Sequence, residues 1–154
     1  MKKFFLLAAI AFALVSCRST KVEDGKNEKS LSLSSCEGNW RLTLFMKDEV
    51  AQVIANADLT IAEKGGGNFH ISGFTGANYF NGEASSKNAG QIKVENVGST
   101  RRGATPEVME FETLFLEFLY GVDSFSVEKF ERQAFETLVL KNSSMNAYAH
   151  FSRN

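Results

Sequence analysis

The sequence predicts an α+β fold, in which a curved, mostly antiparallel and barrel-like β-sheet packs on one principal α-helix near residues 106–120. Two observations predict this class. Short runs of alternating apolar residues, separated by turn signals, fill much of residues 40 to 94 and return after residue 124. One stretch with helical periodicity lies between them, and strands on both sides of a single helix are typical of an α+β domain.

The strands expected before the helix alternate apolar and polar residues with a period of two. Their apolar positions are Trp40, Leu42, Leu44 and Met46, followed by the pairs Leu59/Ile61, Phe69/Ile71 and Ile92/Val94. The segments Gly65–Gly67 and Lys87–Gly90 carry residues that hairpin connections favour. Residues 47–57 fit either a short helix or a long loop.

The expected helix has a recognisable start and end. Thr105 suits the N-cap, Pro106 the first helical position, and Glu107 the positive end of the helix dipole. The apolar periodicity runs to Tyr120, and Gly121 is a natural stop. Further strands are expected at residues 125–127, 135–140 and 148–151, with a turn at 142–144.

The first sixteen residues are typical of a secretory leader. Two lysines precede Phe4–Val15, an unbroken apolar run that as a helix spans about 18 Å, too short for a bilayer core of roughly 30 Å. Ser16 before Cys17 resembles the lipobox of bacterial lipoproteins, in which the Cys is diacylated before cleavage. We therefore expect residues 1–16 to be a lipoprotein signal peptide and Cys17 to carry lipid. The alternative is an ordinary signal peptide that contains a Cys.

The segment after the leader is polar and mixed in charge. We expect residues 17–35 to comprise the lipidated Cys17 and a flexible tether, and residues 36–154 to form the folded domain. Arg18 stands where lipoproteins of the inner membrane often have Asp, which favours the outer membrane. Cys36 is then the one cysteine of the domain, so an intrachain disulfide is excluded. We favour a small buried hydrophobe over a free thiol at this position.

Charge and composition argue against several classes of protein. Two of the seventeen basic residues lie in the leader, which leaves fifteen against eighteen acidic ones, so no nucleic-acid partner is expected. A metal site would need His70 and His150 to converge, and their spacing gives no such signal. Gly65–Gly67 lacks the Lys and helix of a phosphate loop. We expect no metal, no cofactor and no enzyme activity.

Several short motifs occur in a characteristic order. They are Gly38–Leu42, Ser72–Gly73, Gly76–Gly82, Ser99–Arg101 and Pro106–Glu112. Together they resemble the META domain, or HslJ-like, family over residues 37 to 152. The family usually has Cys where this chain has Ala77 and Ala104, and Phe74–Thr75 resembles a small insertion. The resemblance implies a small envelope protein, associated with heat shock, antibiotic tolerance or virulence, without established catalytic residues.

Two loops contain candidate interaction residues. Asn78 and Tyr79 lie within Gly73–Gly82, which is either a recognition loop or a conformationally demanding turn, and we favour the turn. Thr100 and Arg101 precede the helix at the densest positive spot of the domain, which suits lipid phosphates or an acidic partner. A solvated loop with local bonds is the alternative.

Glu112 is the most informative residue of the helix. At 100° per residue it lies about 200° from Glu110, among the apolar side chains of the packing face. A carboxylate buried there needs hydrogen-bond donors, because burying it unpaired costs several kcal/mol. We expect it to accept bonds from Asn78 or backbone N–H groups of residues 73–82, or from Thr100 and Arg101. This structural latch is preferred over a general acid.

Two classes of function remain. The first is a monomeric, lipid-anchored envelope protein whose non-catalytic domain binds another envelope protein, with a stress-related role or as a chaperone or pilot for an outer-membrane assembly. The second is a carrier of a small apolar ligand or lipid, built from a curved sheet with a helix over its mouth. The two are distinguished by the helix: if its Phe and Leu side chains fill the sheet, the carrier has no cavity.

Overall fold

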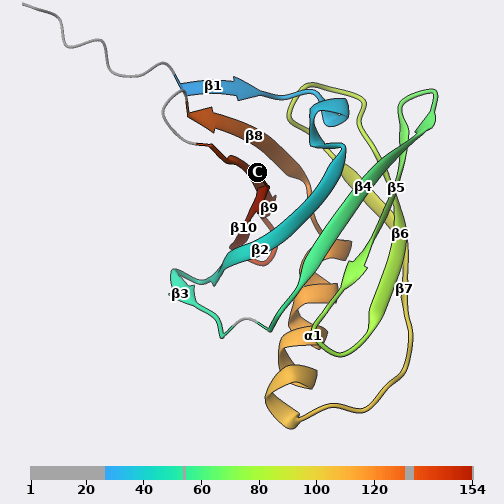
Figure 1. Ribbon diagram of the computed structural model, residues 1–154, viewed down its shortest axis with the longest axis vertical. Coiled ribbons are helices and arrows are strands. Elements are labelled where there is room, and N and C mark those ends of the chain that lie inside the picture. The colour runs from blue at the N-terminus through green and yellow to red at the C-terminus, as the bar shows by residue number, and fades with distance from the viewer. Residues whose placement is uncertain (1–26, 54, 131–133, 154) are drawn as a thin grey trace, which may run out of the picture.

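Ten strands among the described residues, 27–53, 55–130 and 134–153, form one curved antiparallel sheet beside helix α1 in this computed structural model (Figure 1). Their bounds are β1 Asn27–Ser30, β2 Gly38–Lys47, β3 Val50–Ala51, β4 Asp58–Gly65, β5 Asn68–Phe74, β6 Tyr79–Ser85, β7 Lys93–Ser99, β8 Ser124–Phe130, β9 Glu136–Asn142 and β10 Ala147–Arg153. The order across the sheet is β1-β8-β9-β10-β2-β4-β5-β6-β7, and β3 pairs with β2 beside this path. The predicted α+β class is confirmed.

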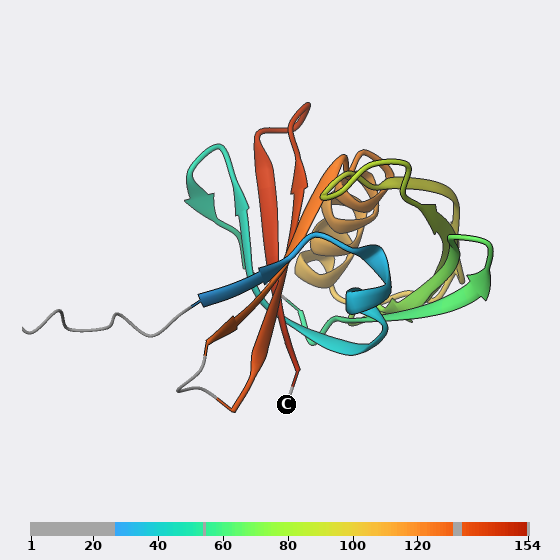
Figure 2. The ribbon, with the colours of Figure 1, turned by 90° about the horizontal axis from the view of Figure 1, so that it is seen from above.

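The sheet curves strongly but does not close into a barrel. Near its two ends, the segment before β7 meets the start of β8 at an isolated bridge between Gln91 and Ser124, where the Phe125 N–H also donates to the Gly90 carbonyl at 2.9 Å. Helix α1 (Pro106–Tyr120) covers the concave face, as Figure 2 shows. The helix therefore fills the interior that the curved sheet surrounds.

Aromatic side chains fill the interior between the sheet and α1. The Phe45 ring on β2 contacts the rings of Phe111, Phe115 and Phe118 on the helix, with centroids 5.0 to 6.2 Å apart. Phe115 also packs against Phe151 of β10 at 6.3 Å. All five side chains are at most 5% exposed. Burial of this size supplies the main favourable term for folding.

The helix has the ends predicted from the sequence. Thr105 is the N-cap residue, and its carbonyl accepts from the Met109 N–H at 3.0 Å, although its hydroxyl makes no capping bond. At the other end the Gly121 N–H donates to helix carbonyls, and the Asn142 side chain of β9 donates to the Phe118 carbonyl at 3.0 Å. A Cβ on Gly121 would lie 2.4 Å from the Asn142 amide, which explains why glycine is needed there.

The described residues of the ambiguous segment 47–57 form no helix. Strand β2 continues to Lys47, Asp48 and Glu49 turn the chain with positive φ, and the short β3 pairs back onto β2. The hairpin predicted at Gly65–Gly67 is confirmed, with positive φ at all three residues.

Strand β6 corrects the expectation that Gly73–Gly82 is one loop. Gly73 lies in β5 and Gly82 in β6, which leaves only a short turn between the two strands. Glycine at position 73 serves close packing, because a Cβ there would lie 2.1 Å from the Asp58 carbonyl oxygen. Glycines that permit such contacts resemble turn glycines in a sequence.

The start of the folded domain also needs correction. The tether was expected to reach residue 35, but β1 pairs antiparallel with β8 and is followed by the 3-10 helix η1 (Leu33–Cys36). The Leu33 side chain is buried, and the Leu31 carbonyl accepts from the Gly90 N–H at 2.9 Å. Residues 27–35 therefore belong to the domain. The signal peptide 1–16, Cys17 and the remaining tether 17–26 lie outside the described residues.

The two ends of the described chain are joined by Arg153. Its guanidinium lies 4.1 Å from the Trp40 ring centroid and donates to the carboxylate of Glu136 on β9 at 2.6 to 2.7 Å. It also donates to the carbonyls of Ser35, at 3.0 Å, and Glu37. We refer to these contacts as the Arg153 clamp, because they hold η1 against the C-terminal end of β10.

The clamp covers a buried thiol. Cys36 is completely buried, and burial raises the pKa of its thiol to about 12. Its carbonyl accepts from the Trp40 indole N–H at 2.7 Å. Cys36 thus occupies the core as a small apolar side chain, the alternative favoured from the sequence.

We expect Arg153→Lys to lower the free energy of unfolding by about 1–2 kcal/mol, because an ammonium cannot keep the paired bonds to Glu136 while it reaches both carbonyls. Urea denaturation followed by Trp40 fluorescence measures the loss. The control is Lys93→Ala, which removes an exposed ion pair with Glu95 and should change stability by less than about 0.5 kcal/mol. Equal losses in the two variants would contradict a role for the clamp.

Candidate functional site

The most constrained polar cluster of the domain surrounds Glu112. This residue lies on the face of α1 that packs against the sheet and is only 7% exposed. Its carboxylate is directed at the turn between β5 and β6. We call the side chains of Thr75, Asn78, Thr100 and Glu112, with the backbone of Arg102, the Glu112 latch.

Two neutral donors serve the carboxylate. The Asn78 amide nitrogen lies 3.0 Å from both carboxylate oxygens, and the Thr75 hydroxyl donates to Oε2. Thr75 is completely buried and Asn78 is 1% exposed. The carboxylate is therefore matched by hydrogen bonds in a site that excludes water, as a buried charge requires.

Asn78 uses its whole hydrogen-bonding capacity within the latch. Its Oδ1 accepts from the Thr100 hydroxyl at 2.9 Å and from the Arg102 N–H at 2.6 Å. Its Nδ2 donates to the Arg102 carbonyl at 3.1 Å as well as to Glu112. One amide thus joins the β5–β6 turn, the loop before α1, and the helix itself.

Backbone bonds hold the same segments together. The Thr75 N–H donates to the Asn78 carbonyl at 2.9 Å, and the Asn78 N–H donates back to the Thr75 hydroxyl at 3.0 Å. Tyr79 and Thr100 face each other across two further bonds, of 2.9 and 3.1 Å. Gly76 completes the turn with a φ of +92°, where a Cβ would lie 2.4 Å from that of Ala55. The turn and the pre-helix loop are therefore held in one arrangement.

The structure brings together three of the five candidate residues. Asn78, Thr100 and Glu112 meet in the latch, and the bond from Asn78 to Glu112 is one of those expected from the helix phase. The side chains of the other two candidates lie at the surface. Tyr79 is 58% exposed, and its ring lies 5.1 Å from that of Phe74, while Arg101 is exposed.

Two members of the latch were not expected. In the sequence, Thr75 stood out only as part of a segment that resembles a small insertion. Its contact with Glu112 spans 37 residues of sequence. The pre-helix loop contributes the backbone of Arg102 instead of the Arg101 side chain. Nothing in the residues around Thr75 indicates that it is buried. The one indication that Glu112 needs a hydrogen-bond donor was its position on the apolar face of the predicted helix.

The other groups with chemical potential lie apart. His70 on β5 and His150 on β10 are separated by β4 and β2, and burial lowers the pKa of His150. Within the described part of the chain, no group of three His, Cys, Asp or Glu side chains is placed to hold a metal ion. No described helix is long and apolar enough to cross a membrane.

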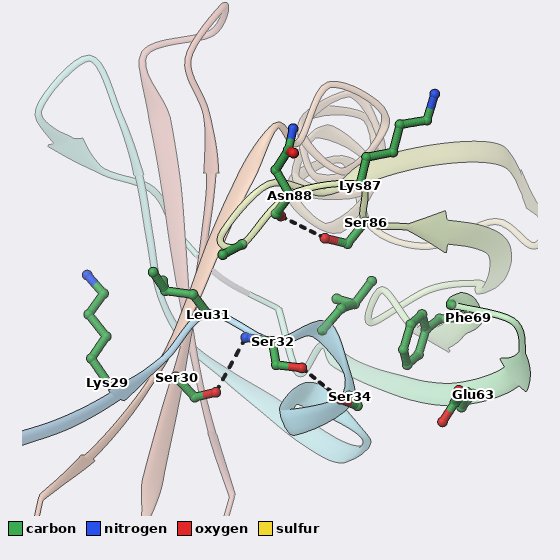
Figure 3. Close-up of a pocket in the computed structure, with 13 residues that line it drawn as sticks. Lys29, Ser30, Leu31, Ser32, Ser34, Glu63, Phe69, Ser86, Lys87 and Asn88 are labelled. Atoms are coloured by element: carbon green, nitrogen blue, oxygen red, sulfur yellow. Dashed lines mark hydrogen bonds between the residues drawn. The ribbon is translucent and has the colours of Figure 1, made fainter.

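The largest cavity lies away from the latch. It has a volume of about 630 Å³ and is formed by β1, η1, the start of β5 and the loop after β6 (Figure 3). Its hydroxyls are committed to local bonds: Ser32 pairs with Ser34 at 2.8 Å, and Ser86 donates to the Asn88 carbonyl at 2.9 Å. Phe69 of β5 lines this cavity, whereas the Phe rings that pack between β2, α1 and β10 do not.

Comparisons with known proteins give two findings. The family model of the META domain matches residues 29–154. A solved NMR structure of a protein from Burkholderia xenovorans is similar in fold, with a TM-score of 0.61 and 21% identity over 100% of this chain and 99% of that one. At this identity the likeness shows the fold alone. A comparison with curated proteins gives no significant match.

We expect Glu112→Gln to be milder than Glu112→Leu. The Gln carbonyl still accepts from Asn78, and its amide can donate to the Thr75 hydroxyl, which then turns its proton to the Asn78 carbonyl 3.1 Å away. The loss should stay below about 1 kcal/mol for Gln and reach about 1–3 kcal/mol for Leu, which leaves a donor of Asn78 unpaired. Urea denaturation of both variants measures the difference.

A polarity swap is the control for this comparison. Asn78→Asp places acceptors against the carboxylate of Glu112 and should cost about 3–5 kcal/mol. Adding Glu112→Gln restores a donor between the two positions, so the double variant should be more stable than Asn78→Asp alone. Additive losses in the double-mutant cycle would show that the latch does not couple the turn to the helix.

Proposed function

The chain belongs to the META domain family, and we propose that it acts as a lipid-anchored, non-catalytic interaction domain of the bacterial cell envelope. The observation that carries the proposal is the saturated Glu112 latch. Its polar atoms bond to each other and hold two surface loops in a fixed arrangement. Such a cluster positions a binding surface, whereas catalysis needs polar groups that reach a substrate.

Burial and bonding support a non-catalytic role for Glu112. A general acid must contact its substrate, but the five best-defined cavities of the described residues include none of Thr75, Asn78 or Glu112 in their walls. The carboxylate meets only the Thr75 hydroxyl and the Asn78 amide. The position therefore suits a group that stabilises the fold.

The latch presents an exposed aromatic and cationic surface. Tyr79 follows Asn78 directly, and Arg101 lies between Thr100 and Arg102. These neighbours, Asn78, Thr100 and Arg102, take part in the latch through side chain or backbone. Tyr and Arg are the residues that most often dominate protein interfaces. Because the latch fixes their backbone, binding through them costs little conformational entropy.

The packed interior favours this interaction domain over a carrier. The Phe rings of β2, α1 and β10 occupy the space between the helix and the sheet, where an apolar ligand would lie. The largest cavity is instead at the surface, with serines and lysines among its walls. Carrier pockets are mostly apolar and enclosed, so the carrier remains the weaker alternative.

The anchor and the location are proposed from the leader sequence. Lipid on Cys17 would hold the domain at the membrane, and Arg18 after it favours the outer membrane over the inner one. An envelope protein is the proposed partner, in a role linked to envelope stress or to assembly at the outer membrane. A monomer is proposed for the domain itself.

The anchor predicts how the protein partitions. The full chain should enter the detergent phase of a phase-separation assay, and Cys17→Ala should abolish lipid modification, leaving an uncleaved precursor or a released protein. Labelling with a fatty-acid analogue and the intact mass of the protein give the readout. Cys36→Ala is the control and should keep the lipid. A mature wild-type chain without lipid would refute the anchor.

The interaction surface predicts where crosslinks form. A photoreactive residue in place of Tyr79 should give one discrete protein adduct in intact cells, identified by mass spectrometry, and Arg101→Glu should reduce it about fivefold or more. The matched control is the same residue at Tyr120, which is 64% exposed at the far end of α1. Equal adducts from both positions, or none from Tyr79, would contradict a specific surface at the latch.

A further inference from the structure

One face of the sheet has no helix over it among the described residues. Strands β8, β9, β10 and β2 bury their inner side chains beneath α1 and direct the alternate ones outward. The pairing places Tyr148 between Lys141 and Met46, and His150 between Val139 and Leu44. We call Leu44, Met46, Val139, Tyr148 and His150 the outer patch.

The outer patch is apolar and aromatic for a sheet surface. Val139 is 7% exposed, and the other four side chains are partly exposed. The rings of Tyr148 and His150 lie 5.3 Å apart. Burial lowers the pKa of His150, so the patch carries no charge from it near neutral pH. A contiguous surface of this kind is typical of a contact site.

Basic side chains flank the patch. Arg41 and Lys141 are exposed on this face, and neither forms an ion pair with a described residue. Two acidic residues lie on the same face. Glu128 pairs with Lys29 at 3.8 Å, and Asp58, the register partner of Arg41, accepts from the Phe74 N–H at 3.0 Å.

The exposed face of α1 is acidic. Helix α1 exposes three acidic residues, Glu107, Glu110 and Glu117, and contains no Lys or Arg. The exposed side of the helix is therefore acidic, whereas the outer patch is apolar and has Arg41 and Lys141 beside it.

The length of the chain brings the outer patch close to a membrane. Figure 2 shows α1 on one side of these strands, and β3 and the start of β1 on the other, the side of the patch. Strand β1 begins at Asn27, which is ten residue steps along the chain from Cys17, with nine residues between them. Ten residues reach at most about 35 Å even when fully extended.

We propose that the outer patch docks on the anionic surface of the bilayer that carries Cys17. Arg41 and Lys141 contact lipid phosphates, and Tyr148 with its apolar neighbours lies at the level of the headgroups, where tyrosine is favoured. Each cation near an anionic surface strengthens the contact about fivefold. This inference rests on the proposed lipid anchor and adds a fixed orientation to it: α1 faces away from the membrane.

The test measures the accessibility of lysines in the full-length protein on vesicles. An amine-reactive reagent is applied on phosphatidylcholine alone and on equal parts of phosphatidylcholine and phosphatidylglycerol, and labelled sites are quantified by mass spectrometry. Lys141 should react about fivefold less on the anionic vesicles, and added salt should restore its labelling. Lys93, exposed on β7, is the matched control and should react equally on both.

Variants separate docking from other causes of protection. Tyr148→Glu should restore Lys141 labelling on anionic vesicles, whereas Tyr120→Glu on the helix should not, with folding checked by circular dichroism. Equal labelling of Lys141 on both vesicles overturns the proposal, and so does protection that survives Tyr148→Glu. The intact mass of the same sample shows whether Cys17 carries lipid, so a missing anchor is distinguished from a patch that does not dock.

Discussion

The curved sheet of this domain does not close into a barrel, and one helix must fill its concave interior while it also buries a carboxylate. The Phe side chains of α1 supply the apolar contacts, but Glu112 lies on the same face and needs donors, because an unpaired buried charge costs several kcal/mol. Asn78 meets that need and is in turn held by Thr100 and the Arg102 backbone. The arrangement of two surface loops therefore follows from one buried group.

Function is proposed for two surfaces that face different directions. The latch fixes Tyr79 and Arg101 at the end of the domain where α1 begins, and the outer patch lies on the face of the sheet opposite the helix. In the proposed orientation the outer patch contacts lipid. The end of the domain that carries Tyr79 and Arg101 then stays accessible to another envelope protein. Because Phe rings fill the interior, binding is proposed at these two surfaces and not in an internal cavity.

Local signals in the sequence predict α1 from Pro106 to Tyr120, the Gly65–Gly67 turn and the burial of Glu112, because each depends on nearby residues. The failures have tertiary causes. Strand β1 is polar, and its extended form depends on pairing with β8 a hundred residues away. Strand β6 was hidden by glycines that permit close packing, and the bond from Thr75 to Glu112 closes over 37 residues. The periodicity of apolar residues along the sequence gives no information on contacts between residues so far apart.

The burial of Cys36 has a consequence for its reaction with other thiols and with disulfides. Exchange between thiols and disulfides proceeds through the thiolate, and a pKa of about 12 leaves almost none of it at neutral pH. The Arg153 clamp and Trp40 also keep other sulfur atoms from reaching it. The thiol of Cys36 is thus unreactive in the folded domain, and it can crosslink two copies only after the domain has opened.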